Sequence, residues 1–371
     1  MSMFIDEIVN SCYQKNEYPA LSSFMAEWMC TRPFEGLRIL VATPIFRNTL
    51  LEYKALLVGG ANLAVGCADG GMPCDEGICE ILQKKGIPVL QPQDVLNDEA
   101  DGDFFDLILD CAGQFACCHP RYGFVELTKS GVQFYENTEA PVYVADSGIV
   151  KRIETSLGTG DGYIRALAHL GYDCLDGKNF VVFGSGKVGV GIVLQLLRCG
   201  ALVNVVTDMS SGVNGFLIAN SVPVVDCKNF EEVAQVIQNA DFVVTATGKK
   251  NALAVPKITS SLLECKAVLA NMGVEDEYGI GVPEDRVLAK KAPLNFILEE
   301  PTHLKYIDAS LALHAALGER LVQEALGFES FESTKLRNPP SELEQRILVT
   351  SMQEGLIGPE INEMIGGPYE E

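Results

Sequence analysis

Short apolar runs alternate with amphipathic stretches along most of the 371-residue chain. Residues 1–35 carry apolar positions at helical spacing and predict helices. Beyond them, apolar runs predict strands at 37–42, 62–66, 88–90, 105–110 and 141–145. Amphipathic segments at 48–58 and 75–85 predict helices between these strands. Strands that alternate with helices at this spacing predict a mostly parallel, doubly wound sheet.

The same alternation returns after a predicted long helix over residues 149–175. The second set of apolar runs predicts strands at 180–183, 201–207, 216–225, 241–247, 267–271 and 295–298. A helical segment over 306–326 is predicted to lead the chain back to the first sheet. The predicted fold class is therefore α/β, with two doubly wound parallel-sheet domains. We assign residues 1–152 and 318–371 to the first domain and residues 153–317 to the second.

A glycine-rich turn follows the first strand of the second sheet. The apolar run Phe180–Phe183 ends on the letters G-S-G-K-V-G, and apolar residues at helical spacing follow. Strand, glycine turn and helix come in the order that a dinucleotide site needs, because the turn brings backbone amides and a helix N-terminus to a pyrophosphate. The predicted cofactor-binding residues of this turn are Gly184, Ser185, Gly186, Lys187, Val188 and Gly189.

Each glycine of this turn has an expected role. Gly184 permits the tight turn, Gly186 lets backbone amides approach the phosphates, and Gly189 lets the helix pack against the strand. Asp208 ends the next apolar run, nineteen residues after Gly189. A carboxylate there can bind the ribose 2′-hydroxyl and repel a 2′-phosphate, which favours NAD over NADP. The alternative is an ordinary turn with a solvated aspartate. We predict that the second domain is a Rossmann domain that binds NAD.

Two later strand ends of the second sheet carry further candidates. Gly248 and Gly273 follow the apolar runs that end at Thr247 and Asn271. Ligands of parallel sheets bind beyond the carboxyl ends of the strands. Thr247, Gly248 and Asn271 are therefore predicted to meet the nicotinamide ribose of the cofactor.

Composition narrows the classes of partner. The net charge is −22, from 28 basic and 50 acidic residues, which argues against nucleic acid and anionic membrane surfaces as partners. No run of eighteen apolar residues occurs, so no membrane span is predicted. A charged N-terminal stretch argues against an export signal, so the twelve cysteines are expected to be reduced thiols in the cytoplasm. Cys74 and Cys79 lack a paired metal-ligand spacing, and no metal is predicted.

Several motifs between about Gly36 and Gly318 resemble those of the S-adenosylhomocysteine hydrolases. F-G-S-G-K-V-G-V-G is similar to that family's nucleotide loop, T-A-T-G at 245–248 to its threonine-rich strand end, and A-N-M-G at 270–273 to its asparagine-glycine turn. L-I-L-D-C-A-G and V-A-D-S-G-I-V-K-R-I-E-T-S resemble segments of its substrate half. The resemblance implies a bilobal enzyme that closes on its substrate, holds NAD tightly and forms homo-oligomers, either dimers or tetramers.

The substrate half departs from the family pattern. Cys111 stands where the family has a second aspartate, and Val274 replaces a histidine. Glu154 and the threonine after it replace an aspartate-asparagine pair, and Lys151 matches the family's lysine only with a one-residue slip. The resemblance therefore implies the cofactor but not the adenosyl substrate.

Three residues near the boundary between the two predicted domains are the predicted catalytic groups. Lys151 is the candidate general base or carbonyl polariser, because loss of hydration in a closing cleft favours a neutral amine. Glu154 lies one turn further along the same predicted helix and could hold Lys151 in place, and Asp146 could orient substrate hydroxyls. The structural alternatives are a surface lysine, an exposed i,i+3 pair and a helix N-cap, respectively.

Four further residues are weaker substrate candidates: Asp75, Cys111, Lys249 and His314. Asp75 opens a predicted helix and could instead be its N-cap. Lys249, next to another lysine, would suit a carboxylate or phosphate but could also lie in a solvated loop. His314 has leucine and alanine neighbours, which are typical of a core or hinge histidine.

These observations leave three hypotheses for function. In the first, the chain is an enzyme that uses tightly held NAD to oxidise a small hydroxylated substrate, with nucleosides among the candidates. In the second, it is an NAD-dependent dehydrogenase of a hydroxy or amino acid. In the third, it is an NAD-binding regulatory protein without catalysis. An enzyme acting on a small molecule is favoured.

Overall fold

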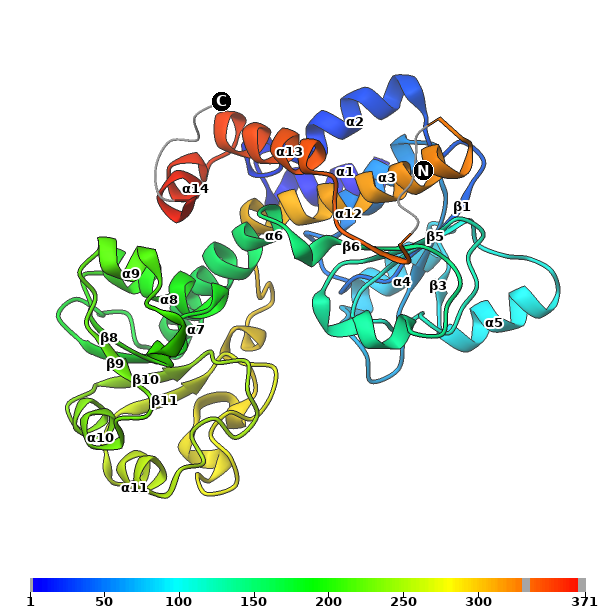
Figure 1. The fold of residues 1–371 in the computed structure, drawn as a ribbon. Helices are drawn as coiled ribbons and strands as arrows, with labels where there is room; N and C mark the ends of the chain where they lie inside the picture. Colours follow the sequence, from blue (N-terminus) through cyan, green and yellow to red (C-terminus); the bar gives the residue numbers. More distant parts are fainter. Residues whose placement is uncertain (1–2, 329–333, 366–371) are drawn as a thin grey trace. The chain divides into compact units, whose positions relative to one another are not determined.

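The computed structural model describes residues 3–328 and 334–365. Within them the chain divides into two compact units, which are described separately (Figure 1). The first unit contains Met1–Lys151 and Leu304–Pro359, and the second contains Arg152–His303 and the described part of Glu360–Glu371. The sequence-based boundary at residue 318 falls inside the helix α12. All of α12 lies in the first unit because it packs as one piece on α2, α3 and the strand β4.

The first unit is built on a parallel sheet of seven strands. Its strands are β1 (Arg38–Val41), β2 (Asn62–Gly66), β3 (Val89–Leu90), β4 (Leu107–Asp110), β5 (Gly123–Glu126), β6 (Val142–Val144) and β12 (Leu336–Arg337). Its helices are α1 (Met3–Cys12), α2 (Pro19–Thr31), α3 (Leu50–Val58), α4 (Glu76–Lys84), α5 (Pro92–Ala100), α12 (Leu304–Ala325) and α13 (Ser341–Glu354). Two helices, α6 (Val150–Arg152) and α14 (Gly358–Ile365), span the unit boundaries.

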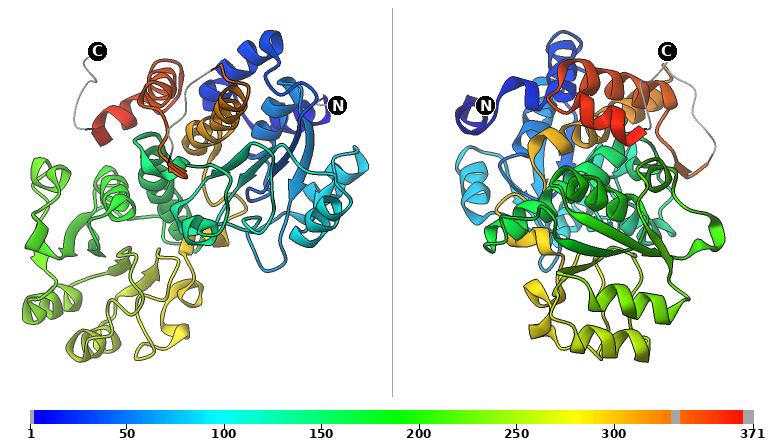
Figure 2. Two further views of the ribbon diagram at one scale, coloured as in Figure 1. Left: turned by 45° about the vertical axis from the view of Figure 1, so that its right-hand side comes forward. Right: turned by 90° about the vertical axis from the view of Figure 1, so that its left-hand side faces the viewer.

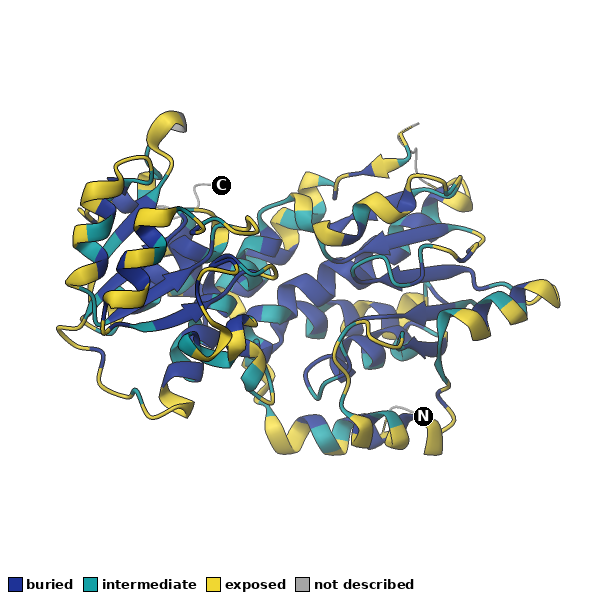
Figure 3. Ribbon diagram, turned by 90° about the horizontal axis from the view of Figure 1, so that it is seen from below, coloured by how far each residue is buried: buried dark blue, intermediate teal, exposed yellow. Residues whose placement is uncertain are grey.

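The strand order of the first sheet is β12-β6-β5-β4-β1-β2-β3, and neighbouring strands are parallel. The chain reverses its direction of travel across the sheet between β1 and β4, so ligands are expected beyond the carboxyl ends of these strands. The helix α12 covers β4: a Cβ atom on Gly318 would lie 3.1 Å from a methyl carbon of Leu109. The strands and α12 are mostly buried (Figure 3).

The second unit is a smaller sheet of five parallel strands. The strands are β7 (Asn179–Phe183), β8 (Leu202–Thr207), β9 (Val224–Asp226), β10 (Phe242–Thr245) and β11 (Val268–Asn271), in the order β11-β10-β7-β8-β9. The helices are α7 (Thr159–His169), α8 (Lys187–Arg198), α9 (Gly215–Ala219), α10 (Phe230–Gln238) and α11 (Pro256–Glu264). A π-helical turn, Ile153–Gly158, runs directly into α7.

The second sheet is buried on both faces because its strand residues alternate between two apolar clusters. Val182 and Val244 face α7, α8 and α9, whereas Val181 and Val243 face α10 and α11. Figures 1 and 2 show the two sets of helices on opposite sides of the strands. Apolar runs without polar alternation are the sequence signature of such strands.

The predicted α/β class with two doubly wound parallel sheets is confirmed. Two predicted strands are wrong. In residues 216–225, Asn214 caps the short helix α9, because its side chain accepts a hydrogen bond from the Phe216 amide, and only the end of the run enters β9. The run at 295–298 forms a 3₁₀ turn, Leu294–Ile297. Within the described ranges, no helix is long and apolar enough to cross a membrane.

A buried aspartate joins α12 to the N-terminus of α2. The Asp308 carboxylate is 2% exposed and accepts hydrogen bonds from the backbone amides of Ala20 at 2.8 Å and Leu21 at 3.1 Å. Burial raises the pKa of Asp308 to about 7, although the two amide hydrogen bonds oppose this shift. A raised pKa in the folded state means that folding favours the protonated form.

We therefore expect the first unit to lose stability as pH rises from 5 to 8. The stabilisation linked to Asp308 is complete below its ordinary pKa and is lost as pH rises to about 7, which between pH 5 and 8 is a change of about 3 kcal/mol. Asp308→Asn should remove this part of the pH dependence. Urea unfolding followed by the fluorescence of Trp28, the chain's single tryptophan and a buried residue of α2, measures it. The exposed Asp101→Asn is the control; equal pH slopes in both variants would contradict the assignment.

Candidate functional site

The glycine turn of the second unit connects β7 directly to α8. Gly184 has φ of +107°, and a Cβ atom there would lie 2.4 Å from the carbonyl oxygen of Ala246. A Cβ atom on Gly189 would lie 2.1 Å from the carbonyl oxygen of Gly184. Both positions therefore require glycine, one for its backbone angle and one for the close approach of helix and turn.

The middle of the same turn is open. Gly186 is exposed, and a Cβ atom there would have no neighbour within 4 Å. It is the N-cap residue of α8, whose first backbone amides have no partner inside the helix. Lys187 is exposed and Val188 is partly exposed beside it. An open helix N-terminus of this kind attracts anions such as phosphate.

A cavity of about 320 Å³ adjoins this turn, within the second unit. Its walls come from the ends of β7, β8 and β10 and from α10 and α11, including Gly184, Ser185, Asp208, Thr247 and Lys249. The Ser185 and Thr207 hydroxyls are 2.8 Å apart and join the first two strand ends. The cavity lies where the strand order reverses between β7 and β10, as expected for a nucleotide site.

Asp208 lies at the mouth of the cavity and is held by two donors. Its Oδ1 accepts hydrogen bonds from the Ser210 amide at 2.9 Å and from Lys228 Nζ at 3.0 Å. Hydrogen bonds from Ser210 and then from Lys228 hold the pKa of Asp208 well below its ordinary value. The carboxylate therefore stays ionised and can accept further hydrogen bonds. Lys228 was not predicted from the sequence, since it lies twenty residues away on another strand end.

Asp208→Ala should weaken NAD binding and relax the rejection of NADP. The variant removes both the acceptor for a ribose hydroxyl and the charge that repels a 2′-phosphate, while Lys228 keeps its positive charge nearby. We expect a loss of about 10-fold in NAD affinity, roughly one good charged hydrogen bond. Calorimetric titration with both nucleotides measures the ratio, and Asp226→Ala on the neighbouring strand end is the control. An unchanged NAD-to-NADP ratio would contradict the role of Asp208.

Glu277 fixes the end of β10 beside the cavity. This buried side chain accepts hydrogen bonds from the Thr247 amide at 2.8 Å, the Thr247 hydroxyl at 2.8 Å and the Gly248 amide at 2.7 Å. Thr247 and Gly248 are thus positioned from a separate loop. Glu277 was missed in the sequence because its partners are about thirty residues away.

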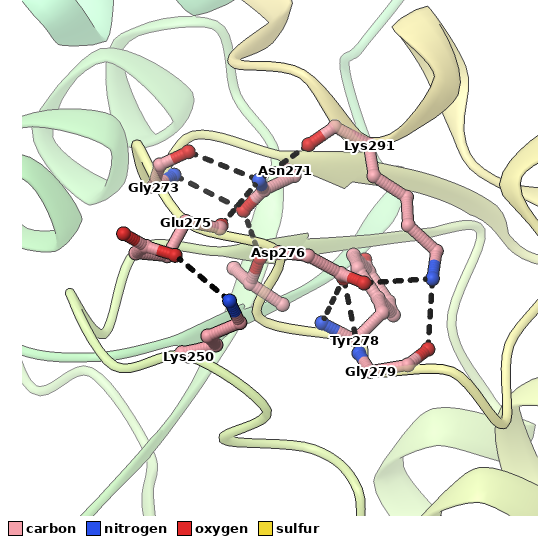
Figure 4. A network of polar contacts seen from close by, with 9 residues as sticks. Lys250, Asn271, Gly273, Glu275, Asp276, Tyr278, Gly279 and Lys291 are labelled. Carbon is pink, nitrogen blue, oxygen red and sulfur yellow. Dashed lines mark hydrogen bonds and ion pairs between the residues drawn. The ribbon is translucent and has the colours of Figure 1, made fainter.

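Asn271 organises the loop after β11, as Figure 4 shows. Its Nδ2 donates to the carbonyl oxygens of Gly273, Glu275 and Lys291, and its Oδ1 accepts from the Thr245 hydroxyl and the Gly273 amide. The predicted contact of Asn271 with the nicotinamide ribose stays a prediction. In the structure its side chain is buried and holds the loop.

Lys291, which lies in a backbone turn with positive φ angles, also holds the loop after β11. Lys291 Nζ donates to Asp276 at 2.9 Å and to the Gly279 carbonyl at 2.7 Å (Figure 4). Residues 289–291 all have positive φ, a conformation that costs about 1 kcal/mol or more for each non-glycine residue. Lys249 is exposed, which agrees with the alternative that it lies in a solvated loop. Lys250 forms an exposed ion pair with Glu275.

The candidates of the first unit lie at several strand ends. The Asp75 side chain accepts a hydrogen bond from the Ile78 amide and is the N-cap of α4, which is the structural alternative for this residue. Cys111 is buried directly after β4. Asp146 is partly exposed in a 3₁₀ turn, Ala145–Ser147, after β6.

Lys151 and Glu154 fall on opposite sides of the unit boundary. Lys151 is 2% exposed on α6, so the surface-lysine alternative does not hold. Glu154 is partly exposed in the π-helical turn of the second unit. Their catalytic roles stay predictions.

His314 is a core residue of the first unit. Its Nδ1 lies 2.7 Å from the Glu52 carboxylate and its Nε2 lies 3.1 Å from the Val125 carbonyl oxygen, with no exposure of either side chain. Burial lowers the pKa of His314, but the charge and hydrogen bond of Glu52 outweigh it and raise the pKa. Since a carbonyl only accepts, Nε2 carries a proton here. His314 is therefore a core histidine whose ring nitrogens both have hydrogen-bond partners, which is the alternative stated for it in the sequence analysis.

A buried acid pair shapes the loop after β4. Tyr135 Oη lies 2.7 Å from Asp110 and 3.2 Å from Glu126, and neither carboxyl is exposed. Glu126 also accepts hydrogen bonds from the amides of Ala112 and Gly113 at 3.0 Å. Burial raises the pKa of Asp110 to about 7. The pair escaped notice because β5, which carries Glu126, was not predicted.

Comparison with known proteins agrees with the site's geometry. Residues 158–291 match the family described as S-adenosyl-L-homocysteine hydrolase, NAD binding domain. This range contains the whole glycine turn, Asp208, Thr247 and Asn271. The chain is therefore similar to S-adenosylhomocysteine hydrolases in its NAD-binding domain. Its second unit is accordingly an NAD-binding domain, which confirms the predicted cofactor.

Relatives that align over most of the chain share little identity with it. An adenosylhomocysteinase of Thermoplasma volcanium is 24% identical over 311 residues, or 77% of this chain and 73% of that protein. An S-inosyl-L-homocysteine hydrolase of Methanococcus maripaludis is 24% identical over 95% of this chain and 92% of its own length.

Among solved structures, a dipicolinate synthase chain from Bacillus halodurans is similar. It aligns with a TM-score of 0.52 and 16% identity, covering 78% of this chain and 99% of its own. At this identity the likeness concerns the fold alone, and it agrees with the α/β class of the chain.

Proposed function

We propose that this protein is an NAD-dependent enzyme that oxidises a hydroxyl group of a small, nucleoside-like substrate. The observation that carries the proposal is the open glycine turn beside the 320 Å³ cavity, with an ionised Asp208 at its mouth. The S-inosyl-L-homocysteine hydrolase that aligns over 95% of this chain supports a nucleoside thioether as the substrate class.

The residues of the second unit fit the cofactor. The amides at the N-terminus of α8 would hold the pyrophosphate of NAD, and Asp208 would bind a ribose hydroxyl. The loop that carries Thr247 and Gly248 would contact the nicotinamide side of the cofactor. When bound, NAD would supply a hydride acceptor. Glu277 and Asn271 would keep the two neighbouring strand ends in place during the reaction.

Lys151 is proposed to take the proton from the substrate hydroxyl, with Glu154 and Asp146 as supporting groups. The burial of Lys151 supports this role, because an amine with little hydration gives up its proton more readily than one in water. Asp146, directly after β6, has the position of a group that orients substrate hydroxyls in a parallel sheet.

The test is a search for hydride transfer by the purified chain. Protein saturated with NAD is mixed with S-inosyl- and S-adenosylhomocysteine, adenosine and inosine, and absorbance at the wavelength of NADH is recorded. A burst of bound NADH that later decays would support the proposal. Continuous NADH release with a hydroxy or amino acid would favour a plain dehydrogenase, and bound NAD without turnover on the whole panel would favour a regulatory protein.

Lys151→Ala should reduce the rate of hydride transfer by about 10²-fold or more, the usual contribution of a positioned base. NAD affinity should be unchanged, because Lys151 lies outside the matched NAD-binding residues. Single-turnover absorbance measures the rate of hydride transfer, and calorimetry measures the affinity for NAD. Arg152→Ala, at the next position, is the control; full hydride transfer in Lys151→Ala would remove Lys151 from the mechanism.

Assembly and location belong to the same proposal. We propose a cytoplasmic homo-oligomer, a dimer or tetramer. Val274 and Ile280 on one loop of the second unit are 88% and 100% exposed, and we propose them as part of the contact surface. Light scattering of the purified chain measures its mass, and a monomer at micromolar concentration would contradict the oligomer.

A further inference from the structure

Three cysteines meet at the carboxyl end of β2 in the first unit. Cys67 directly follows β2, Cys74 lies in the loop before α4, and Cys79 is in the first turns of α4. The sulfur atoms of Cys67 and Cys74 are 3.3 Å apart. Cys74 also lies close enough to Cys79 to raise the pKa of the Cys79 thiol, so Cys74 is the middle thiol of the group. We call Cys67, Cys74 and Cys79 the thiol cluster.

Backbone contacts hold both partners of the short sulfur contact. The Cys67 amide donates to the Leu90 carbonyl at 2.9 Å, which ties it to β3. Cys74 forms a parallel bridge with Ile45, with hydrogen bonds of 3.1 and 2.8 Å on either side of it. The two sulfur atoms therefore face each other from anchored segments. A disulfide needs about 2.05 Å between them, so each sulfur would move by less than about 1 Å.

The three thiols differ in their access to solvent. Cys74 is exposed, whereas Cys67 and Cys79 are partly buried. Burial, together with the neighbouring thiol of Cys74, raises the pKa of Cys67 to about 12 and that of Cys79 to about 11. These two thiols are held protonated at neutral pH. Because Cys74 is the exposed thiol, it is the one that a peroxide in solution reaches first.

We propose that the thiol cluster is a site of reversible oxidation, in which Cys67 and Cys74 form a disulfide. With a hydroperoxide as the oxidant, the Cys74 sulfur attacks one peroxide oxygen and becomes a sulfenic acid, and one molecule of water or alcohol leaves. The Cys67 sulfur then attacks the Cys74 sulfur and expels a second water. Two thiols lose two protons and two electrons, and the peroxide is reduced. Cys79 stands next to Cys74 and can exchange with the bond.

A metal site is the competing explanation for a group of thiols. Within the part of the chain that the structure describes, no three His, Cys, Asp or Glu side chains are arranged to hold a metal ion. The geometry therefore favours sulfur–sulfur chemistry.

Oxidation would act on the loop that leads to Asp75. The disulfide would close the eight-residue segment from Cys67 to Cys74, and Asp75 is the next residue and the N-cap of α4. This loop lies beyond the carboxyl end of β2, at the edge of the sheet where parallel-sheet proteins bind ligands. The site would thus couple the redox state of the solution to the ligand-binding edge of the first unit.

A single tryptic peptide allows the oxidation of the thiol cluster to be measured. Trypsin cleaves after Lys54 and Lys84 and not between them, so one peptide, residues 55–84, contains all three thiols and no other cysteine. The full-length protein is reduced, desalted, treated with hydrogen peroxide, alkylated, digested and measured by mass spectrometry. The peptide should carry one alkyl group instead of three, and its thiols should be lost at least about tenfold faster than the exposed Cys12 and Cys30. Dithiothreitol should restore all three sites.

Two matched variants decide which pair forms. Cys74→Ser should leave Cys67 and Cys79 fully alkylated after oxidation, whereas Cys79→Ser should keep the disulfide between the other two. Three alkyl groups on the oxidised wild-type peptide, or a disulfide that persists in Cys74→Ser, would overturn the proposal. Stoichiometric zinc in the purified protein that is lost in Cys74→Ser would overturn it in favour of a metal site.

Discussion

Gly186→Ala is expected to weaken NAD binding by about 100-fold and to leave the folding of the second unit intact. A Cβ atom at this position has no protein neighbour within 4 Å, and the backbone φ of −74° suits alanine. The added methyl group would project into the space through which the pyrophosphate approaches the α8 amides. A 100-fold loss corresponds to about 2.7 kcal/mol of binding free energy. Calorimetric titration with NAD and a thermal unfolding scan measure the two quantities.

Gly215→Ala is the matched control, because a Cβ atom there also has no neighbour within 4 Å, and it lies away from the cavity. Both variants should unfold at the same temperature, and only Gly186→Ala should lose NAD. Gly189→Ala should differ from both, since its Cβ would clash with the Gly184 carbonyl and so reduce stability as well as binding. If Gly186→Ala binds NAD like the wild type, the turn is not the phosphate site.

Glu277→Ala is expected to lower the free energy of unfolding of the second unit by about 3–5 kcal/mol. The variant removes an acceptor of three hydrogen bonds and leaves the amides of Thr247 and Gly248 without these partners. Each hydrogen bond to a charged group contributes about 1.5–3 kcal/mol, and an orphaned donor adds its own desolvation cost. Urea unfolding followed by circular dichroism measures the loss, and hydrogen exchange should show faster exchange at Thr247 and Gly248.

Glu275→Ala, on the same loop as Glu277, is the control for this prediction. The Glu275 side chain is 54% exposed, and its ion pair with Lys250 spans 3.8 Å, so Glu275→Ala should change stability by less than about 0.5 kcal/mol. Equal stabilities of Glu277→Ala and Glu275→Ala would show that the contacts of Glu277 do not hold the strand ends together.

The parts of this fold that the sequence predicts are those that depend on neighbours along the chain. Buried parallel strands need continuous apolar runs, and the turn from β7 to α8 needs glycines at fixed spacing, so both can be seen locally. The two wrongly predicted strands have the same cause, because apolar content along the chain was the only signal for them. The run at 295–298 is as apolar as a strand but lies in a 3₁₀ turn, and Asn214 starts a helix where apolar content predicts a strand.

The groups that support the site could not be predicted, because they act over long distances in the sequence. Lys228 reaches Asp208 from the neighbouring strand end, and Glu277 holds Thr247 from a loop beyond β11. Nothing near Glu277 in the sequence distinguishes it from Glu275, yet one is buried and the other exposed. Only the pairing of strands brings each of these side chains to its partner.

The π-helical turn over Ile153–Gly158 has a consequence for changes in the length of this segment. A wider turn takes up one more residue than an α-helical turn over the same length, so a helix can gain a residue while the segments before and after it keep their orientation. Deleting a single position from this turn should therefore be better tolerated than deleting one from the regular helix α7 that follows.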